Sequence, residues 1–242
     1  MTAPVPALRR ALSGAGERLV VDLGSPHRSV SSAVLGGGLG WVRTWLDLQV
    51  ERPYTRTDPD VHLLRESADL PPPVVGMLTA ARVARFQRAV VGGAHSVATV
   101  GVGHALAAAG NRPRVAPVAA PSRDGQAAAL PATIDRPRAM PAAGTINLLV
   151  VVDEPLTDAG LVNALQTAVE AKAQALAAAR VPAANAEGYA TGTATDSVCV
   201  ACPPGGRVPF AGPVTRVGAE LALAVLEAVR SGAKLDRAAA TG

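Results

Sequence analysis

The sequence predicts an α/β (or α+β) fold: a single layered domain in which helices pack against a mixed sheet. In its second half, strand-like and helix-like patterns alternate, which is typical of a layered sheet. The composition supports one sizeable core, because 49% of the 242 residues are hydrophobic. Only 2% are aromatic, so small aliphatic side chains must fill that core. We expect the domain to span residues 18–235, with 1–17 and 236–242 as tails.

The first half of the chain predicts mainly strands. Its opening residues, 1–16, predict a loose or weakly helical tail, and a polar loop is expected over 51–60. Three prolines at 71–73 break the chain, because proline cannot continue a regular element. Apolar runs predict strands over 18–23, 27–35, 41–50 and 94–102, and spacing predicts helices over 74–88 and 103–109.

The second half predicts its elements from clearer patterns. Residues 145–152 are β-branched and aliphatic apart from one amide, and they predict a strand. A helix is expected over 157–180, with Thr157 or Asp158 as N-cap and Pro182 just past its end. Further along, the pattern predicts a strand over 189–202 and a helix over 218–229.

An insertion rich in Ala, Pro and Arg separates the two halves. Residues 111–143 show no periodicity, so we expect a flexible segment that interrupts the domain. It holds five arginines against two aspartates, which accounts for +3 of the formal net charge of +4. Basic side chains with aromatic partners on folded elements, as nucleic-acid surfaces require, are missing. We therefore expect no nucleic-acid partner.

We expect neither a membrane span nor a bound metal or cofactor. Residues 89–110 lack charged side chains, but two histidines and five glycines make them poor material to face hydrocarbon. Cys199 and Cys202 would face opposite sides of a strand, so we interpret them as core residues. No P-loop, HExxH or complete dinucleotide fingerprint occurs. Scarce cysteine, with no signal-peptide pattern, favours the cytoplasm.

Polar side chains on the predicted strand 189–202 indicate a functional site. Thr191, Thr193 and Thr195 occupy every second position, so they would line one face of the strand. Asp196 would then point to the opposite face. A strand that is otherwise apolar rarely carries so many polar groups without a function, so we expect them to contact a ligand.

A lysine lies on the apolar side of the predicted helix 157–180. At about 100° per residue, Lys172 falls within an apolar stripe. Three explanations remain open: the side chain extends to the edge of the helix, pairs with a buried carboxylate such as Asp196, or polarises a group or transfers a proton. Glu170 falls on the opposite side, where solvated residues are usual. The stripe consists of Leu161, Leu165, Ala168, Val169 and Leu176.

Two more polar positions have open interpretations. Asn147 is the amide in the strand over 145–152; it either fixes the register as a satisfied core amide or donates to a ligand carbonyl or oxyanion. Ser31 and Ser32 precede a glycine-rich run at 36–40, and they are either ligand contacts or turn formers.

Several segments, in their order and spacing, resemble one enzyme family, the adenosylcobinamide amidohydrolases. The resemblance extends from about residue 31 to about residue 229, outside the insertion. Three positions depart from the family pattern: Ala194 stands where a glycine is expected, Asp47 where an asparagine is expected, and a histidine expected near Val214 is replaced. The segments are GMLTAA at 76–81, TVG at 99–101, GTIN at 144–147, LTD at 156–158, EAK at 170–172 and ATGTATD at 190–196.

The resemblance implies a reaction and a set of site residues. Members of this family cleave the amide that joins aminopropanol to a propionyl side chain of the corrin ring, giving adenosylcobyric acid, in corrinoid salvage and remodelling. A corrinoid is then the small-molecule partner, and no cofactor beyond this substrate is expected. The implied catalytic residues are Lys172, Asp196 and Glu170. The implied substrate-binding residues are Thr79, Asn147, Thr193, Thr195 and Ser32.

Amide hydrolysis needs a base and oxyanion donors, and these residue types supply both. A carboxylate of Asp196 or Glu170 suits the activation of water, and Lys172, an amide or a hydroxyl suits the oxyanion. A threonine nucleophile ranks lower, because nothing in the sequence places a base beside Thr193 or Thr195. The alternative is a non-catalytic corrinoid- or nucleotide-binding protein on the same scaffold. A degraded site would be expected to lose either its lysine or its carboxylate, so the presence of both favours catalysis.

Overall fold

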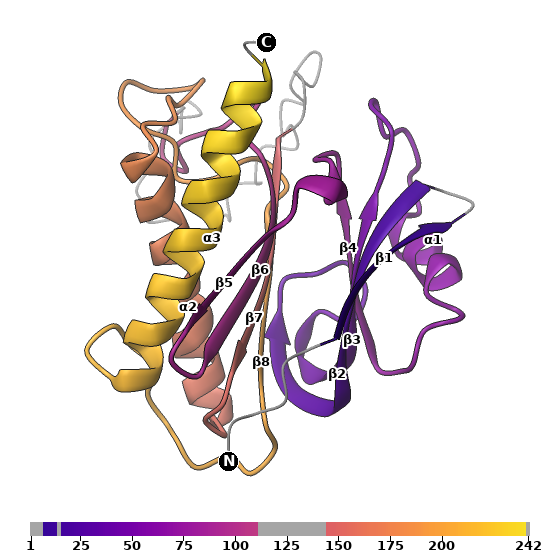
Figure 1. Cartoon of the computed structure of the whole chain (residues 1–242), viewed down its shortest axis with the longest axis vertical. Coiled ribbons are helices and arrows are strands. Elements are labelled where there is room, and N and C mark those ends of the chain that lie inside the picture. Colours follow the sequence, from indigo (N-terminus) through magenta and orange to yellow (C-terminus); the bar gives the residue numbers. More distant parts are fainter. Residues whose placement is uncertain (1–6, 14–15, 111–143, 241–242) are drawn as a thin grey trace, which may run out of the picture.

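The structure, a computed structural model, describes residues 7–13, 16–110 and 144–240. Within these ranges the chain forms an eight-stranded mixed sheet, and two long helices cover one face of it (Figure 1). This confirms the predicted α/β architecture. The insertion expected at 111–143 lies outside the described residues. Among the helices of the described ranges, none has the length and apolar character needed to cross a bilayer.

The sheet has the strand order β4-β3-β2-β8-β7-β6-β5, and β1 pairs with β2 beside this path. Most neighbours are antiparallel, but β3 and β4 are parallel, and so are β7 and β8. The amino ends of β7 and β8 therefore lie at the same end of the sheet. The bounds are β1 (Ala7–Ser13), β2 (Gly16–Ser31), β3 (Gly38–Gln49), β4 (Val74–Thr79), β5 (Gln87–Val91), β6 (Ala94–Gly101), β7 (Thr145–Val152) and β8 (Ser197–Cys202).

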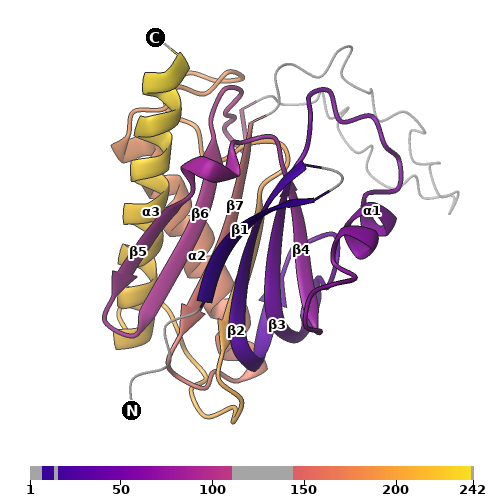
Figure 2. The same cartoon turned by 45° about the vertical axis from the view of Figure 1, so that its right-hand side comes forward.

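Two of the α-helices, α2 (Asp158–Ala178) and α3 (Arg216–Ala240), run side by side against β5 to β8 (Figure 1). The short α1 (Pro59–Glu66) lies beside β4, at the other side of the molecule (Figure 2). Thr157 is the N-cap of α2, because its side chain accepts a hydrogen bond of 3.1 Å from the Gly160 amide. Of the two caps that the sequence predicted, the structure has the threonine.

Two apolar cores form on opposite faces of β6 to β8. The outer core joins these strands to α2 and α3, with Leu148 and Val225 among its buried members. The inner core packs Trp45 and Met77, from the β2–β4 half, against Leu149 and other residues of the β6–β8 half. The two halves of the sheet therefore face each other. Alternate residues of β7 point into this inner space, which is how a polar side chain on β7 meets residues of β3 and β4.

The two cysteines confirm this two-faced arrangement. Both are free and buried. Cys199 belongs to the inner core and Cys202 to the outer core, so their side chains point to opposite faces of β8, as predicted. Burial raises the pKa of the Cys199 thiol to about 12, which suits a core residue rather than a nucleophile.

The prediction of a helix over 74–88 was wrong. These residues form β4, a short 3₁₀ turn (Val83–Arg85) and the start of β5. β4 pairs in parallel with β3 over Thr44↔Val74 to Gln49↔Thr79, and this long-range pairing overrides the local apolar spacing. The helix expected over 103–109 was also wrong, because the chain there forms turns and an isolated bridge.

Other differences concern element boundaries. The tail expected to be loose or weakly helical contains β1, which pairs antiparallel with β2, and the expected loop over 51–60 runs into α1. Pro59 opens α1, a common position for proline because the first helical amides need no partner. α3 starts before and ends well after the range predicted, 218–229. Both β1 and the last turn of α3 extend beyond 18–235, the bounds expected for the domain.

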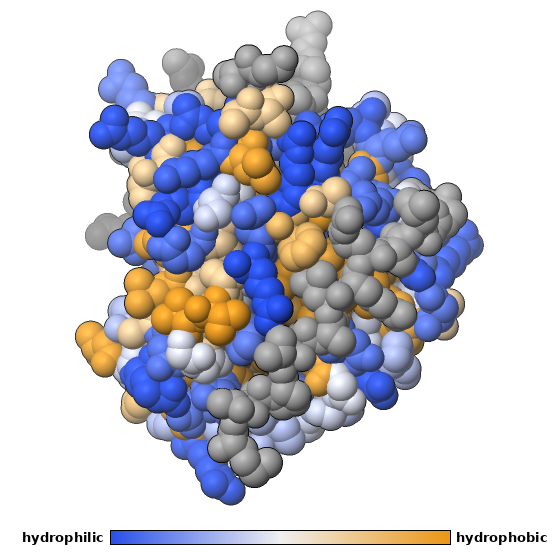
Figure 3. Space-filling view, in the orientation of Figure 1, coloured by the Kyte–Doolittle hydropathy of each residue, from blue (hydrophilic) through white to orange (hydrophobic). Residues whose placement is uncertain are grey.

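Hydrophobic patches interrupt a mostly hydrophilic surface on the side shown in Figure 3. Large apolar side chains stay exposed on both long helices, among them Val162 and Val169 of α2 and Leu223 of α3. Val169 was expected in the buried stripe of its helix, but it is 42% exposed. The stripe that faces the sheet is narrower than predicted, because alanines provide most of its close contacts.

Candidate active site

Lys172 and Asp196 form an ion pair at the amino ends of β7 and β8. The helical spacing of α2 turns Lys172 toward the sheet between buried alanines, as the sequence predicted. Asp196 directly precedes β8. Their side chains are only 8% and 10% exposed. Of the three explanations for this lysine, the structure has the pairing with a carboxylate, and removing one partner would leave a charge with little access to water.

Four donors surround the Asp196 carboxylate. Its Oδ1 accepts hydrogen bonds from the Ile146 amide at 3.0 Å and from the Thr193 hydroxyl at 2.5 Å. Its Oδ2 accepts from the Thr193 amide at 3.0 Å and from the Lys172 ammonium. An ionised carboxylate offers about four lone-pair positions, so this carboxylate is fully engaged within the protein.

The same hydrogen bonds explain why the predicted strand over 189–202 was wrong in its first half. Asp196 bonds back to the Thr193 amide and closes a turn, a local contact that competes with strand pairing. β8 therefore begins only at Ser197. Thr193 and Asp196 do not point to opposite faces, as strand alternation would require. They hydrogen-bond to each other, while Thr191 accepts from the Ala108 amide at 2.9 Å.

Gly192 leaves room for the ion pair. A Cβ at this position would overlap Asp196 Oδ2 and would lie 2.8 Å from Lys172 Nζ. Any other residue would push the carboxylate and the ammonium away from the turn. The glycine is required here for the close approach of side chains to the backbone, not for a positive φ.

Thr195 and Ser32 lie on the exposed side of this cluster. Thr195 Oγ1 is 2.8 Å from Thr145 Oγ1 and donates to the Gly144 carbonyl at 3.2 Å. Ser32 Oγ accepts from the Val198 amide at 3.0 Å and is 3.4 Å from Ser197 Oγ. Both residues are exposed, so their hydroxyls are accessible to a ligand. Ser31, in contrast, is a turn former that accepts from the Ala33 amide.

A second polar cluster is completely buried between the two halves of the sheet. Asp47 of β3 accepts from Thr99 Oγ1 at 2.6 Å and from Asn147 Nδ2 at 2.7 Å. Asn147 Nδ2 also donates to the Leu78 carbonyl at 2.9 Å. These acceptors fix the orientation of the amide and leave Asn147 Oδ1 buried with no hydrogen-bond partner in the described part of the chain.

Burial raises the pKa of Asp47 from its ordinary value to about 7, against the opposing effect of the hydrogen bonds from Thr99 and Asn147. The sequence marked Asp47 only as a departure from a family pattern. The signal that was missed is the position of a carboxylate in an apolar strand. Its partners lie 52 and 100 residues away along the chain, so no local spacing brings them together.

The match to known proteins agrees with this convergence of distant segments. A family model described as adenosylcobinamide amidohydrolase matches residues 8–241. The chain belongs to this family. An adenosylcobinamide amidohydrolase from Halobacterium salinarum is 43% identical over 99 residues, which are 40% of this chain and 38% of that protein. The alignment thus spans well under half of this relative. Membership of the adenosylcobinamide amidohydrolase family confirms the resemblance read from the sequence.

Most of the site residues expected of an adenosylcobinamide amidohydrolase gather in one region. Thr99, Asn147 and Ser197 are register partners across β6, β7 and β8. Thr79 is buried at the end of β4, next to the Leu78 carbonyl that binds Asn147, and its hydroxyl accepts from the Ala81 amide at 3.0 Å. The buried Asp47 cluster and the Lys172–Asp196 cluster therefore share strand β7, one at its inner face and one at its amino end.

Glu170 lies apart from these clusters. It is on the exposed side of α2, where its carboxylate accepts from Gln166 Nε2 at 3.1 Å. This is the solvated position that helical spacing alone indicates, and the structure does not bring Glu170 to Lys172 or Asp196. Its expected catalytic role stays a prediction.

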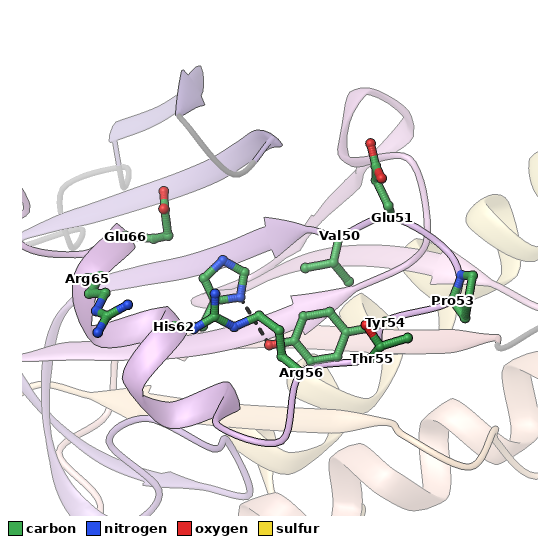
Figure 4. Close-up of a pocket in the computed structure, with 9 residues that line it drawn as sticks. All are labelled: Val50, Glu51, Pro53, Tyr54, Thr55, Arg56, His62, Arg65 and Glu66. Carbon is green, nitrogen blue, oxygen red and sulfur yellow. Dashed lines mark hydrogen bonds between the residues drawn. The ribbon is translucent and has the colours of Figure 1, made fainter.

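A pocket of about 460 Å³ opens between α1 and the loop that follows β3 (Figure 4). Its innermost residue, Val50, donates its amide to the Thr79 carbonyl at 2.8 Å, so the pocket adjoins the buried cluster. The pocket does not include the expected site residues. It is lined by Val50, Glu51, Pro53, Tyr54, Thr55, Arg56, His62, Arg65 and Glu66. In the described ranges, no group of three or more His, Cys, Asp or Glu side chains is arranged to hold a metal ion.

Proposed function

We propose that the protein hydrolyses the amide of adenosylcobinamide, releasing aminopropanol and adenosylcobyric acid, and thereby serves corrinoid salvage and remodelling. Membership of the family supports this reaction. The observation that carries it is the convergence of family segments: residues of the ATGTATD, GTIN and EAK segments meet around one carboxylate, Asp196. The same role would place the protein in the cytoplasm, where scarce cysteine fits a reducing compartment.

The groups gathered there suit amide hydrolysis. The reaction needs a base for the attacking oxygen and donors for the oxyanion that forms. Asp196 supplies a carboxylate in contact with a hydroxyl, and Lys172 supplies an ammonium beside it. An ammonium has three donors, and Asp196 takes one of them, so Lys172 retains donors for a developing negative charge. Thr195 and Ser32 would contact the substrate from the exposed side.

The activity is tested by incubating the purified protein with adenosylcobinamide and following both products by mass spectrometry. Equal amounts of adenosylcobyric acid and aminopropanol support the proposal. The alternative is a non-catalytic corrinoid- or nucleotide-binding protein on the same scaffold. It predicts that adenosylcobinamide binds and is recovered intact.

We also propose that these residues act without a metal or redox cofactor. The reaction then needs only the carboxylate, ammonium and hydroxyl groups already described. Turnover is expected to persist after dialysis against a chelator. A loss of turnover that a divalent metal restores would contradict this part of the proposal.

A further inference from the structure

We propose that Thr193 is the nucleophile of the reaction and that Asp196 is its base; this rests on the proposed amidohydrolase function. Sequence reasoning ranked a threonine nucleophile lower for want of an adjacent base. The structure supplies one, because the Thr193 hydroxyl donates to Asp196 Oδ1 at 2.5 Å. An activated nucleophile requires a base within hydrogen-bond reach and a third group that orients the base. Lys172 and the Ile146 amide hold the carboxylate in place.

Exposure separates Thr193 from its partners. Thr193 is partly exposed, whereas the side chains of Lys172 and Asp196 are 8% and 10% exposed. A substrate carbonyl can therefore approach the hydroxyl more readily than the carboxylate behind it. A hydrolytic water acting directly on Asp196 would have to displace one of its four donors. The geometry thus favours the hydroxyl as the first attacking group.

The reaction then proceeds in two balanced halves. Thr193 Oγ1 attacks the amide carbon while its proton passes to Asp196, and Lys172 stabilises the oxyanion. Collapse breaks the C–N bond, and Asp196 gives the proton to the departing aminopropanol nitrogen. The corrin propionyl group remains as an ester on Thr193. Water then attacks this ester, its proton passes through Asp196 to the threonine oxygen, and adenosylcobyric acid leaves.

The test combines substitutions at Thr193 with a chemical probe. Thr193→Ala should lower turnover of adenosylcobinamide about a thousandfold or more, as expected when a nucleophile is removed. Thr193→Ser should retain measurable turnover because it keeps a hydroxyl. Thr191→Ala, in the same loop, is the matched control, since its hydroxyl contacts only a backbone amide among the hydrogen bonds described. Circular dichroism and melting temperature establish that each variant folds.

The probe is p-nitrophenyl propionate, an activated ester that carries no corrin ring. The wild-type protein should gain one propionyl group, located on Thr193 by peptide mass spectrometry, and Thr193→Ala should not. Acylated Thr193 with no turnover of adenosylcobinamide would overturn the proposed function and leave the nucleophile assigned. Turnover that persists in folded Thr193→Ala would overturn the nucleophile and leave the function.

A second inference rests on the separate pocket in Figure 4. We infer that it binds the adenosyl group of the substrate, which again rests on the proposed function. The rings of Tyr54 and His62 are parallel within 8°, and Tyr54 Oη lies 3.0 Å from His62 Nδ1 (Figure 4). Flat rings beside a cavity suit the face of a heterocyclic base. The chain has only two tyrosines, so one of them at this place is notable.

Charge and size narrow the ligand further. Two arginines and two glutamates line the pocket, so their charges balance and do not favour a phosphate. The adenosyl group is a neutral nucleoside. A volume of about 460 Å³ falls in the range of pockets for drug-sized ligands, which fits a nucleoside but not a whole corrin ring. Val50 and Thr79 connect the pocket to the Asp47 cluster, so one substrate can extend across both.

Binding of 5′-deoxyadenosine, measured by calorimetry, tests this subsite without any turnover. Tyr54→Ala should weaken binding about tenfold, in line with the loss of one stacking contact, and Tyr54→Phe should retain most of it. Tyr189→Ala, at the chain's other tyrosine, is the matched control and should bind normally. Equal binding by the wild-type protein and a folded Tyr54→Ala variant, or no binding by the wild type, would overturn the subsite.

Discussion

Asp47 illustrates how a single buried carboxyl can set the pH dependence of stability. Its pKa is raised to about 7 by burial, so ionising it costs free energy in the folded state. The stabilisation is fully present below the pKa of the unfolded chain, about 4, and is lost as pH rises through the folded value. The free energy of unfolding should therefore fall between about pH 4 and pH 7, by up to about 4 kcal/mol.

Asp47→Asn removes this ionisation. We expect the variant to be more stable than the wild-type protein at pH 8 and to lose that advantage near pH 4.5, as measured by urea unfolding at both values. The Thr99 hydroxyl can reverse its role and accept from the new amide, so the buried contacts can persist. Unfolding curves that differ by the same amount at both pH values would contradict the raised pKa.

At the residue scale, the sequence predicted what a single local period can reveal. Lys172 was expected to be buried because helical spacing alone places it on the apolar side of α2, and it is. Its pairing with Asp196 was one of three open explanations. The links of Asp47 to Thr99 and Asn147 could not be predicted, because they depend on how two halves of a sheet face each other.

At the scale of elements, the loop before β8 has a shape that its side chains impose. Gly192→Ala should displace the Asp196 carboxylate and the Lys172 ammonium, since the added methyl group would overlap the former. We expect a loss of stability of about 1–3 kcal/mol and a clear fall in turnover. Gly103→Ala is the control, because a Cβ there meets no atom within 4 Å. Normal turnover and melting temperature in Gly192→Ala would show that this close approach is unimportant.

Elements were predictable where local pattern and tertiary context agree. β7 spans the residues predicted for it, and α2 has a capping threonine at the predicted place. The segment over 74–88 failed because pairing with β3 outweighs its helical spacing. The threonine segment failed because Asp196 closes a turn with its own neighbours. In both cases a contact outside the local period decides the structure.

At the scale of the whole molecule, the two halves of the sheet supply different parts of the site. β3 and β4 provide the inner cluster, while β7, β8 and α2 provide the ion pair. The insertion at 111–143 joins these regions in sequence but lacks the apolar periodicity of a core element. Replacing it with a short Gly/Ser linker should leave folding and turnover largely intact, as measured by soluble yield, circular dichroism and product formation. A loss of soluble protein would show that the segment packs against the domain.

The central claim is that the Lys172–Asp196 pair serves hydrolysis of adenosylcobinamide, and one rate measurement tests it most directly. Formation of adenosylcobyric acid is compared for the wild-type protein, Lys172→Met and Lys234→Met, which replaces the chain's other, exposed lysine. The account predicts that Lys172→Met folds but forms product about a hundredfold more slowly, as expected for a lost transition-state contact of about 3–4 kcal/mol, while Lys234→Met is unaffected. A folded Lys172→Met variant with near-normal product formation would contradict it.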